Sequence, residues 1–285
     1  MTNLPTAPLE VAIAQLNAQD DVEANLATLE TLAKRAQQSG AKLLALPEGC
    51  TILGDADKKR AAAEPIPKVG GAPKEGRALV AISKLAQEHR LFIAAGGLVL
   101  ASGDATRPHN AHVVFSSDGS VLAIYRKVHL FDVDLADGTH LRESDSTTAG
   151  APDEVVHVDV EGWRLGLSIC YDLRFPEMYR RLVDAGAHAL LIPSAFTVPT
   201  GKDHWHVLMR ARAIESQAYV LAPAQWGRHP SQRLTYGKSL VADPWGDVIA
   251  QATDGVGLAR ATLDPRRLAD VRAQLPSLRH RRMES

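Results

Sequence analysis

The chain has 285 residues, of which 45% are hydrophobic and 23% charged, and its formal net charge at pH 7 is −1. This composition is typical of an ordinary globular protein. The near-zero charge argues against the broad basic surface with which proteins bind nucleic acids or anionic membranes.

The sequence shows no segment that would anchor it in a membrane. No apolar run approaches the ~20 residues that span a bilayer, and residues 1–5 lack the basic segment and apolar core of a secretory signal. The two cysteines, Cys50 and Cys170, are far apart and build no disulfide framework. We therefore expect a cytoplasmic protein with reduced thiols.

Strands and helices are predicted to alternate through the first hundred residues. The second strand ends in a carboxylate, Glu48, and residues 54–76, rich in Lys, Pro, Gly and Ala, are predicted as a long loop or lid. From hydrophobic spacing, we expect strands at residues 11–16, 42–48 and 91–100, and helices at 22–36 and 74–90.

A hairpin and a polar loop are predicted in the middle of the chain. Two apolar strands, residues 111–115 and 120–125, flank a Ser-Ser-Asp-Gly turn, and the second strand delivers Lys127. The polar loop that follows carries the acidic residues Asp132, Asp134, Asp137, Glu143 and Asp145.

The stretch from Leu165 to Glu177 predicts a buried strand, a sharp turn and a helix. Cys170 stands where the apolar strand ends, and Pro176 suits the first helical position because its φ is fixed. Gly186 is a suitable C-terminal stop for that helix. A thiol at such a corner can point into a cleft, although an unselected cysteine in an apolar run is usually a buried hydrophobe.

The rest of the chain continues the alternation. Asp203 is predicted to cap a helix that runs through Ile214, and Asp264 is predicted to cap a final helix. Further strands are expected at residues 155–160, 164–169, 187–192, 219–222, 239–242, 248–252 and 257–262.

An internal repeat relates two of these strands. Residues 40–47 align without gaps to residues 186–193, and each segment follows an amphipathic helix. The match predicts two related halves, each a sheet with helices outside, packed sheet against sheet. In that arrangement Glu48 and Ser194 occupy equivalent strand ends, and Glu48 can share one rim with Cys170.

Three predicted strand ends present Glu48, Lys127 and Cys170, which together suit the hydrolysis of an amide. A thiol needs a base to become a nucleophile, and a carboxylate shielded from water is a better base because burial raises its pKa. The tetrahedral intermediate carries an oxyanion, which Lys127 can stabilise without a metal. Neighbouring carboxylates would keep that lysine charged.

The residues around these positions resemble the nitrilase, or carbon–nitrogen hydrolase, superfamily. The matching motifs are Leu46–Glu48, Tyr125–Asp132 and Ser168–Glu177, and they lie in the family's order. The resemblance covers nearly the whole chain. It implies one carbon–nitrogen hydrolase domain over residues 1–285, folded as a four-layer αββα sandwich with an internal pseudo-two-fold axis.

The resemblance also implies a role for each site residue. Glu48 is expected as the general base, Lys127 as the oxyanion stabiliser and Cys170 as the nucleophile that forms a thioester, with Glu143 as a supporting second glutamate. No metal and no organic cofactor is expected. The family usually assembles as dimers or larger even oligomers, so we expect a homo-oligomer whose other partners are a small amide and water.

Further motifs are similar to Nit-branch amidases that act on deaminated glutathione. This resemblance implies cleavage of a 2-oxoglutaramate-type amide to 2-oxoglutarate and Cys-Gly. The alternative is an omega-amidase acting on 2-oxoglutaramate itself, and Trp226 departs from the smaller residue expected at its position. No His-x-His-x-His run of a Fhit-type nucleotide hydrolase occurs. The motifs are Pro193–Phe196, Gly201–Trp205, Arg210–Glu215 and Ala224–His229.

Substrate carboxylates need cations, and Arg174, one turn from the nucleophile, is the first candidate. The alternative for this arginine is a structural ion pair with Asp172 or Glu177. The other expected substrate-binding residues are Tyr171, whose N–H would face the oxyanion, Phe196, for which plain packing is the alternative, and Thr197.

The sequence also has features that could indicate a metal site, a second reactive thiol or a different function. His204 and His206 lie two residues apart on a predicted helix and point to different faces, so a shared metal ion is not expected. Cys50 has no adjacent base or cation and is expected to pack rather than react. A catalytically inactive binding protein of the same fold, and an acyl-transferase that shares the thioester, are the alternatives.

Overall fold

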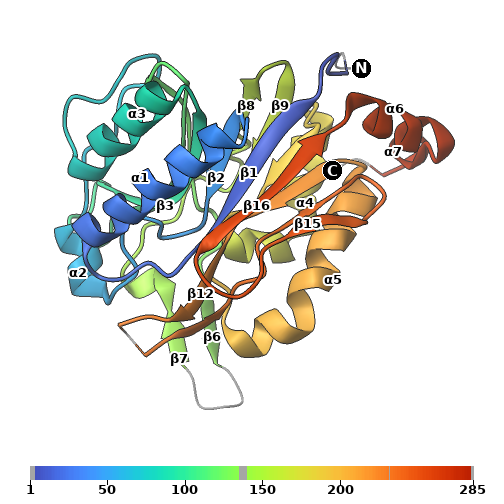
Figure 1. Cartoon of the computed structure of the whole chain (residues 1–285). Coiled ribbons are helices and arrows are strands. Elements are labelled where there is room, and N and C mark those ends of the chain that lie inside the picture. The colour runs from blue at the N-terminus through green and yellow to red at the C-terminus, as the bar shows by residue number, and fades with distance from the viewer. Residues whose placement is uncertain (1–3, 135–139, 231, 284–285) are drawn as a thin grey trace.

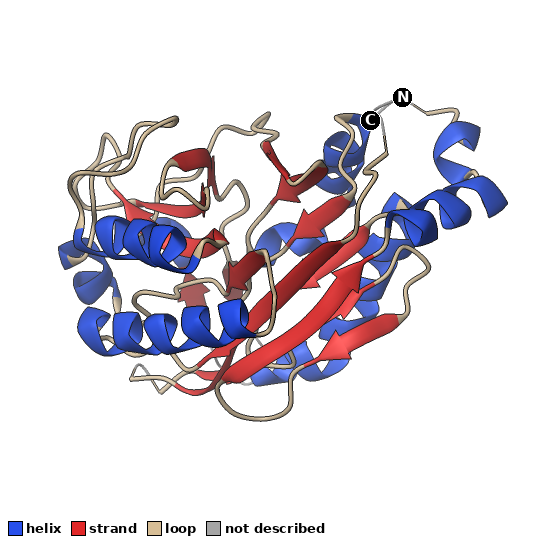
Figure 2. Cartoon of the chain, turned by 45° about the horizontal axis from the view of Figure 1, so that its top comes forward, coloured by secondary structure: helices blue, strands red, loops and turns tan. Residues whose placement is uncertain are grey.

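The alternation of side chains along strand β1 (Leu9–Leu16) accounts for the layered architecture. The odd-numbered residues from Leu9 to Ile13 pack between two sheets, and the even-numbered residues from Ala12 to Leu16 pack beneath helices, because successive side chains of a strand point to opposite faces. The computed structural model describes residues 4–134, 140–230 and 232–283. Two sheets lie face to face with helices on both outer faces (Figures 1 and 2).

The first sheet contains β1 together with β2 (Leu43–Leu46), β3 (Phe92–Leu100), β4 (His109–Phe115), β5 (Val121–Arg126), β12 (Ala224–Arg228), β13 (Leu234–Tyr236) and β16 (Gly257–Leu263). Its order is β13-β12-β1-β2-β3-β4-β5, with β16 paired antiparallel to β1. Strands β12, β1, β2 and β3 run parallel to one another, and β4 and β5 close the edge as an antiparallel hairpin. Its outer face is covered by α1 (Val22–Gln38) and α3 (Arg77–His89).

The second sheet contains β8 (His157–Val160), β9 (Trp163–Leu167), β10 (Ala189–Leu191), β11 (Tyr219–Ala222), β14 (Leu240–Ala242) and β15 (Val248–Gln251). Its order is β15-β14-β11-β10-β9-β8, and β9, β10 and β11 are parallel. Its outer face carries α4 (Pro176–Asp184) and α5 (Val198–Ser216).

Smaller elements connect and flank the two sheets. Among the helices of the described residues, none combines the length and apolar character needed to span a membrane. The smaller elements are α2 (Ala56–Ala61), β6 (Asp132–Asp134), β7 (His140–Arg142), two 3₁₀ turns at Glu143–Asp145 and Cys170–Arg174, α6 (Pro265–Gln274) and α7 (Ser277–His280).

The αββα sandwich and most of the predicted elements are confirmed. Pro176 is the first residue of α4, and the side chain of Asp264 caps α6 by accepting from the Arg266 nitrogen. The 111–115 and 120–125 strands form the predicted antiparallel pair, extended at its ends.

Four predictions of local structure are wrong in detail. The 54–76 segment is not all loop, because it contains α2, and the helix predicted from Lys74 begins only at Arg77, after Gly76 at φ +86°. Helix α5 begins at Val198 instead of after Asp203, with a proline in its first turn. The acidic loop forms the β6–β7 ribbon and a 3₁₀ turn. Asp137 lies outside the described residues.

The internal repeat has the same local structure in both halves. Gly40 and Gly186 both adopt positive φ, +83° and +94°. The next residue in each copy donates its N–H to a carbonyl five positions earlier, Ala41 to Ala36 and Ala187 to Leu182. The strands that follow, β2 and β10, are each flanked on both sides by parallel strands. The two sheets are therefore entered by equivalent helix-to-strand turns.

The Gly96-Gly97 pair marks the place where β3 approaches the Glu48 segment. The register between β3 and β4 shifts between Ala95 and Leu98, as in a β-bulge. A Cβ on Gly97, which has φ +69°, would overlap the Gly49 nitrogen, and a Cβ on Gly96 would overlap the Pro193 ring. The absence of side chains here lets the Glu48 segment lie against β3.

We predict that Gly97→Ala destabilises the protein by about 3 kcal/mol, which adds left-handed strain of ~1–2 kcal/mol to an overpacking cost of ~1–3 kcal/mol. The matched control is Gly70→Ala, where φ is +88° but a Cβ would meet nothing within 4 Å. Urea unfolding of both variants checks this. Equal losses of stability would show that β3 and the Glu48 segment do not need this close approach.

Candidate active site

The three predicted strand ends meet at one cavity of about 200 Å³. Glu48 follows β2, Lys127 follows β5, and Cys170 follows β9, so the first sheet supplies two of the groups and the second sheet one. All three side chains line the cavity, and all three residues are buried. The structure thus brings together residues separated by more than one hundred positions in the chain.

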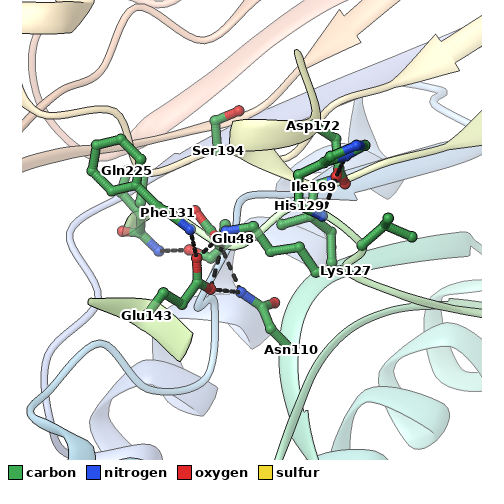
Figure 3. A network of polar contacts seen from close by, with 12 residues as sticks. Glu48, Asn110, Lys127, His129, Phe131, Glu143, Ile169, Asp172, Ser194 and Gln225 are labelled. Carbon is green, nitrogen blue, oxygen red and sulfur yellow. Dashed lines mark hydrogen bonds and ion pairs between the residues drawn. The ribbon is translucent and has the colours of Figure 1, made fainter. Parts of the chain in front are cut away.

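The centre of the site is the buried ammonium group of Lys127, which lies between two carboxylates (Figure 3). Its Nζ donates to Glu48 Oε1 at 2.9 Å and to Glu143 Oε2 at 2.9 Å and Oε1 at 3.1 Å. Glu143 in turn accepts from the Phe131 backbone nitrogen at 2.7 Å, which fixes the 3₁₀ turn that carries it. The predicted second glutamate is therefore in direct contact with the lysine.

Two amide side chains complete this cluster, and neither is predicted as a site residue from the sequence. Asn110 Nδ2 donates to Glu48 Oε1 at 3.0 Å and to Glu143 Oε1 at 3.2 Å, so it bridges the two carboxylates. Gln225 Nε2 donates to the Glu48 carbonyl at 3.0 Å and holds the backbone on the other side. A lone Asn in a strand gives no local signal, whereas Gln225 lies in one of the motifs that carry the family resemblance.

Cys170 stands at a strained corner. It has φ +49°. Its N–H donates to the carbonyl of Pro193 at 2.9 Å, which connects Cys170 to the end of the second repeat segment, just after β10. Non-glycine residues rarely adopt this region, and such strain clusters at functional sites. The predicted sharp turn is a 3₁₀ turn that starts at Cys170 itself.

The buried carboxylate of Asp172 connects the cysteine turn to the lysine segment. It accepts from the Ile169 nitrogen at 2.8 Å and from the Tyr125 hydroxyl at 2.7 Å. It also accepts from the His129 nitrogen at 3.0 Å and lies 2.8 Å from His129 Nδ1 (Figure 3). Residues on both sides of Lys127 and the residue before Cys170 are thus held by one carboxyl group.

Each charged group in the site shifts the pKa of its neighbours. Burial raises the pKa of the Glu48 carboxyl, but the adjacent Lys127 ammonium outweighs burial and holds that pKa at about 2. Burial lowers the pKa of Lys127, and the charges of Glu143 and Glu48 more than offset it, so its pKa lies above the ordinary value. Burial raises the pKa of the Cys170 thiol, and Glu48 raises it further. The site therefore holds a carboxylate, an ammonium and a neutral thiol.

The expectation of a raised pKa for Glu48 is wrong for this reason. A buried carboxyl has a raised pKa only where no cation compensates for lost hydration. The contact between Glu48 and Lys127 supplies that compensation.

The four residues expected to bind substrate all line the cavity. The guanidinium of Arg174 lies 6.0 Å from the Tyr171 ring centroid and 5.6 Å from that of Phe196, and its Nη2 is 3.3 Å from His204 Nδ1. Within the described ranges it forms no ion pair with Asp172 or Glu177, so the structural alternative is not what the structure shows. The other three expected residues, Tyr171, Phe196 and Thr197, line the same cavity. Phe196 also packs edge-to-face on Trp205.

The remaining sequence candidates lie apart from this chemistry. His204 faces Arg174, and His206 Nε2 lies 2.7 Å from Gln251 Oε1, so the two rings do not share a ligand. No group of metal-binding side chains occurs among the described residues. Cys50 packs in the core between the first sheet and its helices, and burial raises the pKa of its thiol to about 12.

Comparisons with known proteins agree on one family. The carbon–nitrogen hydrolase model matches residues 10–273. A deaminated glutathione amidase from Synechocystis sp. is 42% identical over 276 residues, which are 96% of this chain and 98% of that protein. The Caenorhabditis elegans NitFhit structure aligns with a TM-score of 0.86 and 34% identity, over 98% of this chain and 66% of that one. Saccharomyces cerevisiae Nit3, of branch 10 of the nitrilase superfamily, aligns with a TM-score of 0.85 and 29% identity, over 96% of each chain.

The raised pKa of Cys170 makes a testable prediction about its reactivity. Because the neutral thiol dominates at pH 7, alkylation by iodoacetamide should accelerate steadily from about pH 6 to about pH 9 without reaching a plateau. Peptide mass spectrometry measures the rate at Cys170, and a Cys170→Ala protein shows the contribution of the buried Cys50. A plateau below about pH 7 would mean that the thiolate is already present and would contradict this charge assignment.

Proposed function

This chain belongs to the carbon–nitrogen hydrolase family and acts on amides, and we propose that its substrate is deaminated glutathione. The products would be 2-oxoglutarate and Cys-Gly, released through a thioester on Cys170. The observation that carries the proposal is the buried Lys127 ammonium, held by Glu48 and Glu143 beside a thiol at one cavity.

Acylation begins when the Cys170 sulfur attacks the amide carbonyl carbon and its proton passes to Glu48. The carbonyl oxygen becomes an oxyanion, which Lys127 and the backbone N–H of Tyr171 stabilise. Tyr171 lies in the first turn of the 3₁₀ segment, where N–H groups lack partners within the helix. When the intermediate collapses, the carbon–nitrogen bond breaks and the leaving amine takes the proton from Glu48.

A pKa of about 2 makes Glu48 a weak base in the free enzyme, so proton transfer must be coupled to attack. As the oxyanion forms, Lys127 gains a third negative partner beside Glu48 and Glu143, and its hold on Glu48 weakens. The negative charge thus moves from Glu48 to the oxyanion while Lys127 stays charged. Glu143, which keeps its own contact with Lys127, holds the ammonium in place during this exchange.

Hydrolysis of the thioester repeats the same exchange with water. Glu48 takes a proton from water as the oxygen attacks the thioester carbon, and Lys127 again stabilises the oxyanion. The carbon–sulfur bond then breaks, and Glu48 returns the proton to the Cys170 sulfur. No step in this scheme uses a metal or an organic cofactor.

The choice of substrate is supported by the names of the relatives and by the charge of the cavity. The Synechocystis sp. relative is named deaminated glutathione amidase, and that substrate carries carboxylates at both ends. Arg174 lies on the cavity wall with no carboxylate partner among the described residues. An omega-amidase acting on 2-oxoglutaramate is the second candidate. Assembly as an even oligomer stays a prediction of the resemblance, and a cytoplasmic location stays a prediction of the cysteine content.

A substrate panel tests the proposal. The panel contains deaminated glutathione, 2-oxoglutaramate, asparagine and simple nitriles, and product release is measured for each. Deaminated glutathione should have the highest kcat/KM. Cys170→Ala should abolish turnover, because it removes the nucleophile, while its urea midpoint stays close to that of the wild type. Higher kcat/KM for 2-oxoglutaramate would assign the omega-amidase function instead, and full activity of Cys170→Ala would refute the thioester mechanism.

A further inference from the structure

Two cations on the cavity wall have no role in the scheme above. Lys59 comes from α2, within the segment predicted as a lid, and Arg233 comes from the β12–β13 connection. The Lys59 ammonium forms no hydrogen bond or ion pair with any part of the chain that the structure describes. Its neighbour Lys58 behaves as an ordinary surface residue and pairs with Asp20 at 3.2 Å. The sequence gives neither Lys59 nor Arg233 a signal of function.

The guanidinium of Arg233 has a hydrogen-bond partner at one terminal nitrogen but none at Nε. One terminal nitrogen donates to the Ala195 carbonyl, next to Phe196 on the cavity wall. Its Nε is buried and has no hydrogen-bond partner among the described residues. A buried donor without a partner destabilises the fold and calls for a partner.

The two cations influence each other. Burial lowers the pKa of Lys59; Glu143 and Glu48 raise it, and Arg233 lowers it, with a net lowering. The Arg233 guanidinium also helps to lower the pKa of Glu48. Both side chains line the cavity that Glu48 also lines. An anion placed between them would relieve their repulsion and supply the partner that Arg233 Nε lacks.

We propose that Lys59 and Arg233 bind the carboxylate at the acyl end of the substrate, the one carried by the 2-oxoglutaryl group. The proposal rests on the function proposed above and names residues that select its substrate. The carboxylate of a 2-oxoglutaryl group lies four carbon–carbon bonds from the reacting carbon, on the order of 5 Å, so it must find its cation near the triad. Lys59 and Arg233 line the same cavity as the triad.

Arg174 is left for the other end of the substrate. It stacks against Tyr171 and Phe196, and its Nη2 lies 3.3 Å from His204 Nδ1. In deaminated glutathione the leaving group ends in the glycine carboxylate, whereas 2-oxoglutaramate releases only ammonia. The Lys59–Arg233 pair therefore serves both substrates, and Arg174 serves the longer one.

The test compares charged and neutral amides in Lys59→Met, with Lys58→Met as the matched control on the same helix. The neutral amide is 4-oxopentanamide, which has the carbon chain of the acyl group without its carboxylate. Lys59→Met should lower the preference for 2-oxoglutaramate over 4-oxopentanamide, measured as a ratio of kcat/KM, by about 10-fold or more. The same loss is expected with deaminated glutathione, and Lys58→Met should leave the ratio unchanged.

Two outcomes of this experiment would overturn the inference. An unchanged ratio in Lys59→Met would show that the lysine does not bind the carboxylate. A loss confined to deaminated glutathione would place the cations at the leaving group.

Binding of 2-oxoglutarate separates this inference from the proposed function. If the wild type hydrolyses neither oxoglutaryl amide, the proposed substrate is wrong, and calorimetry with a Cys170→Ser protein decides the role of the cations. The inference predicts binding of 2-oxoglutarate that Lys59→Met weakens by about 10-fold. The inference is contradicted if Cys170→Ser does not bind 2-oxoglutarate, or if Cys170→Ser binds it equally well with and without Lys59→Met.

Discussion

The ammonium group of Lys127, buried between Glu48 and Glu143, is the interaction on which the rest of the site depends. A buried charge is tolerated only where opposite charges and hydrogen bonds replace its hydration. The three residues come from three separate segments, so the buried ammonium has its compensating carboxylates only when those segments are in place. The same arrangement leaves a cation poised beside the Cys170 thiol, where an oxyanion would form.

The two sheets contribute differently to this arrangement. The first sheet supplies Glu48 and Lys127, and the second supplies the thiol through a turn whose backbone is hydrogen-bonded to the strand end of the internal repeat. Asp172 joins the two parts, since it accepts from residues before Cys170 and on both sides of Lys127. The distance between nucleophile and cation is thus controlled by a network that touches neither of them directly.

The family motifs predict that Glu48, Lys127 and Cys170 form one site, and the internal repeat predicts that Glu48 and Cys170 share a rim. Strand direction alone does not predict the place of Lys127, because β5 is antiparallel to its neighbour. The repeat also predicted the two-sheet sandwich. Other features depend on distances that a sequence does not contain. The direction of the Glu48 pKa shift follows from how closely Lys127 approaches, and Arg233 reaches the cavity only through the fold of a hairpin. The start of α5 was misplaced because Asp203 is a good capping residue, yet the helix already begins at a proline-containing turn.

The most direct test of this account is the activity of Lys127→Met, measured as kcat in a protein whose circular dichroism matches the wild type. If the buried ammonium stabilises the oxyanion, kcat should fall by about 10²–10³-fold or more, as when an oxyanion donor is removed elsewhere. A folded Lys127→Met protein that keeps kcat within about 10-fold of the wild type would contradict the central role assigned to this lysine.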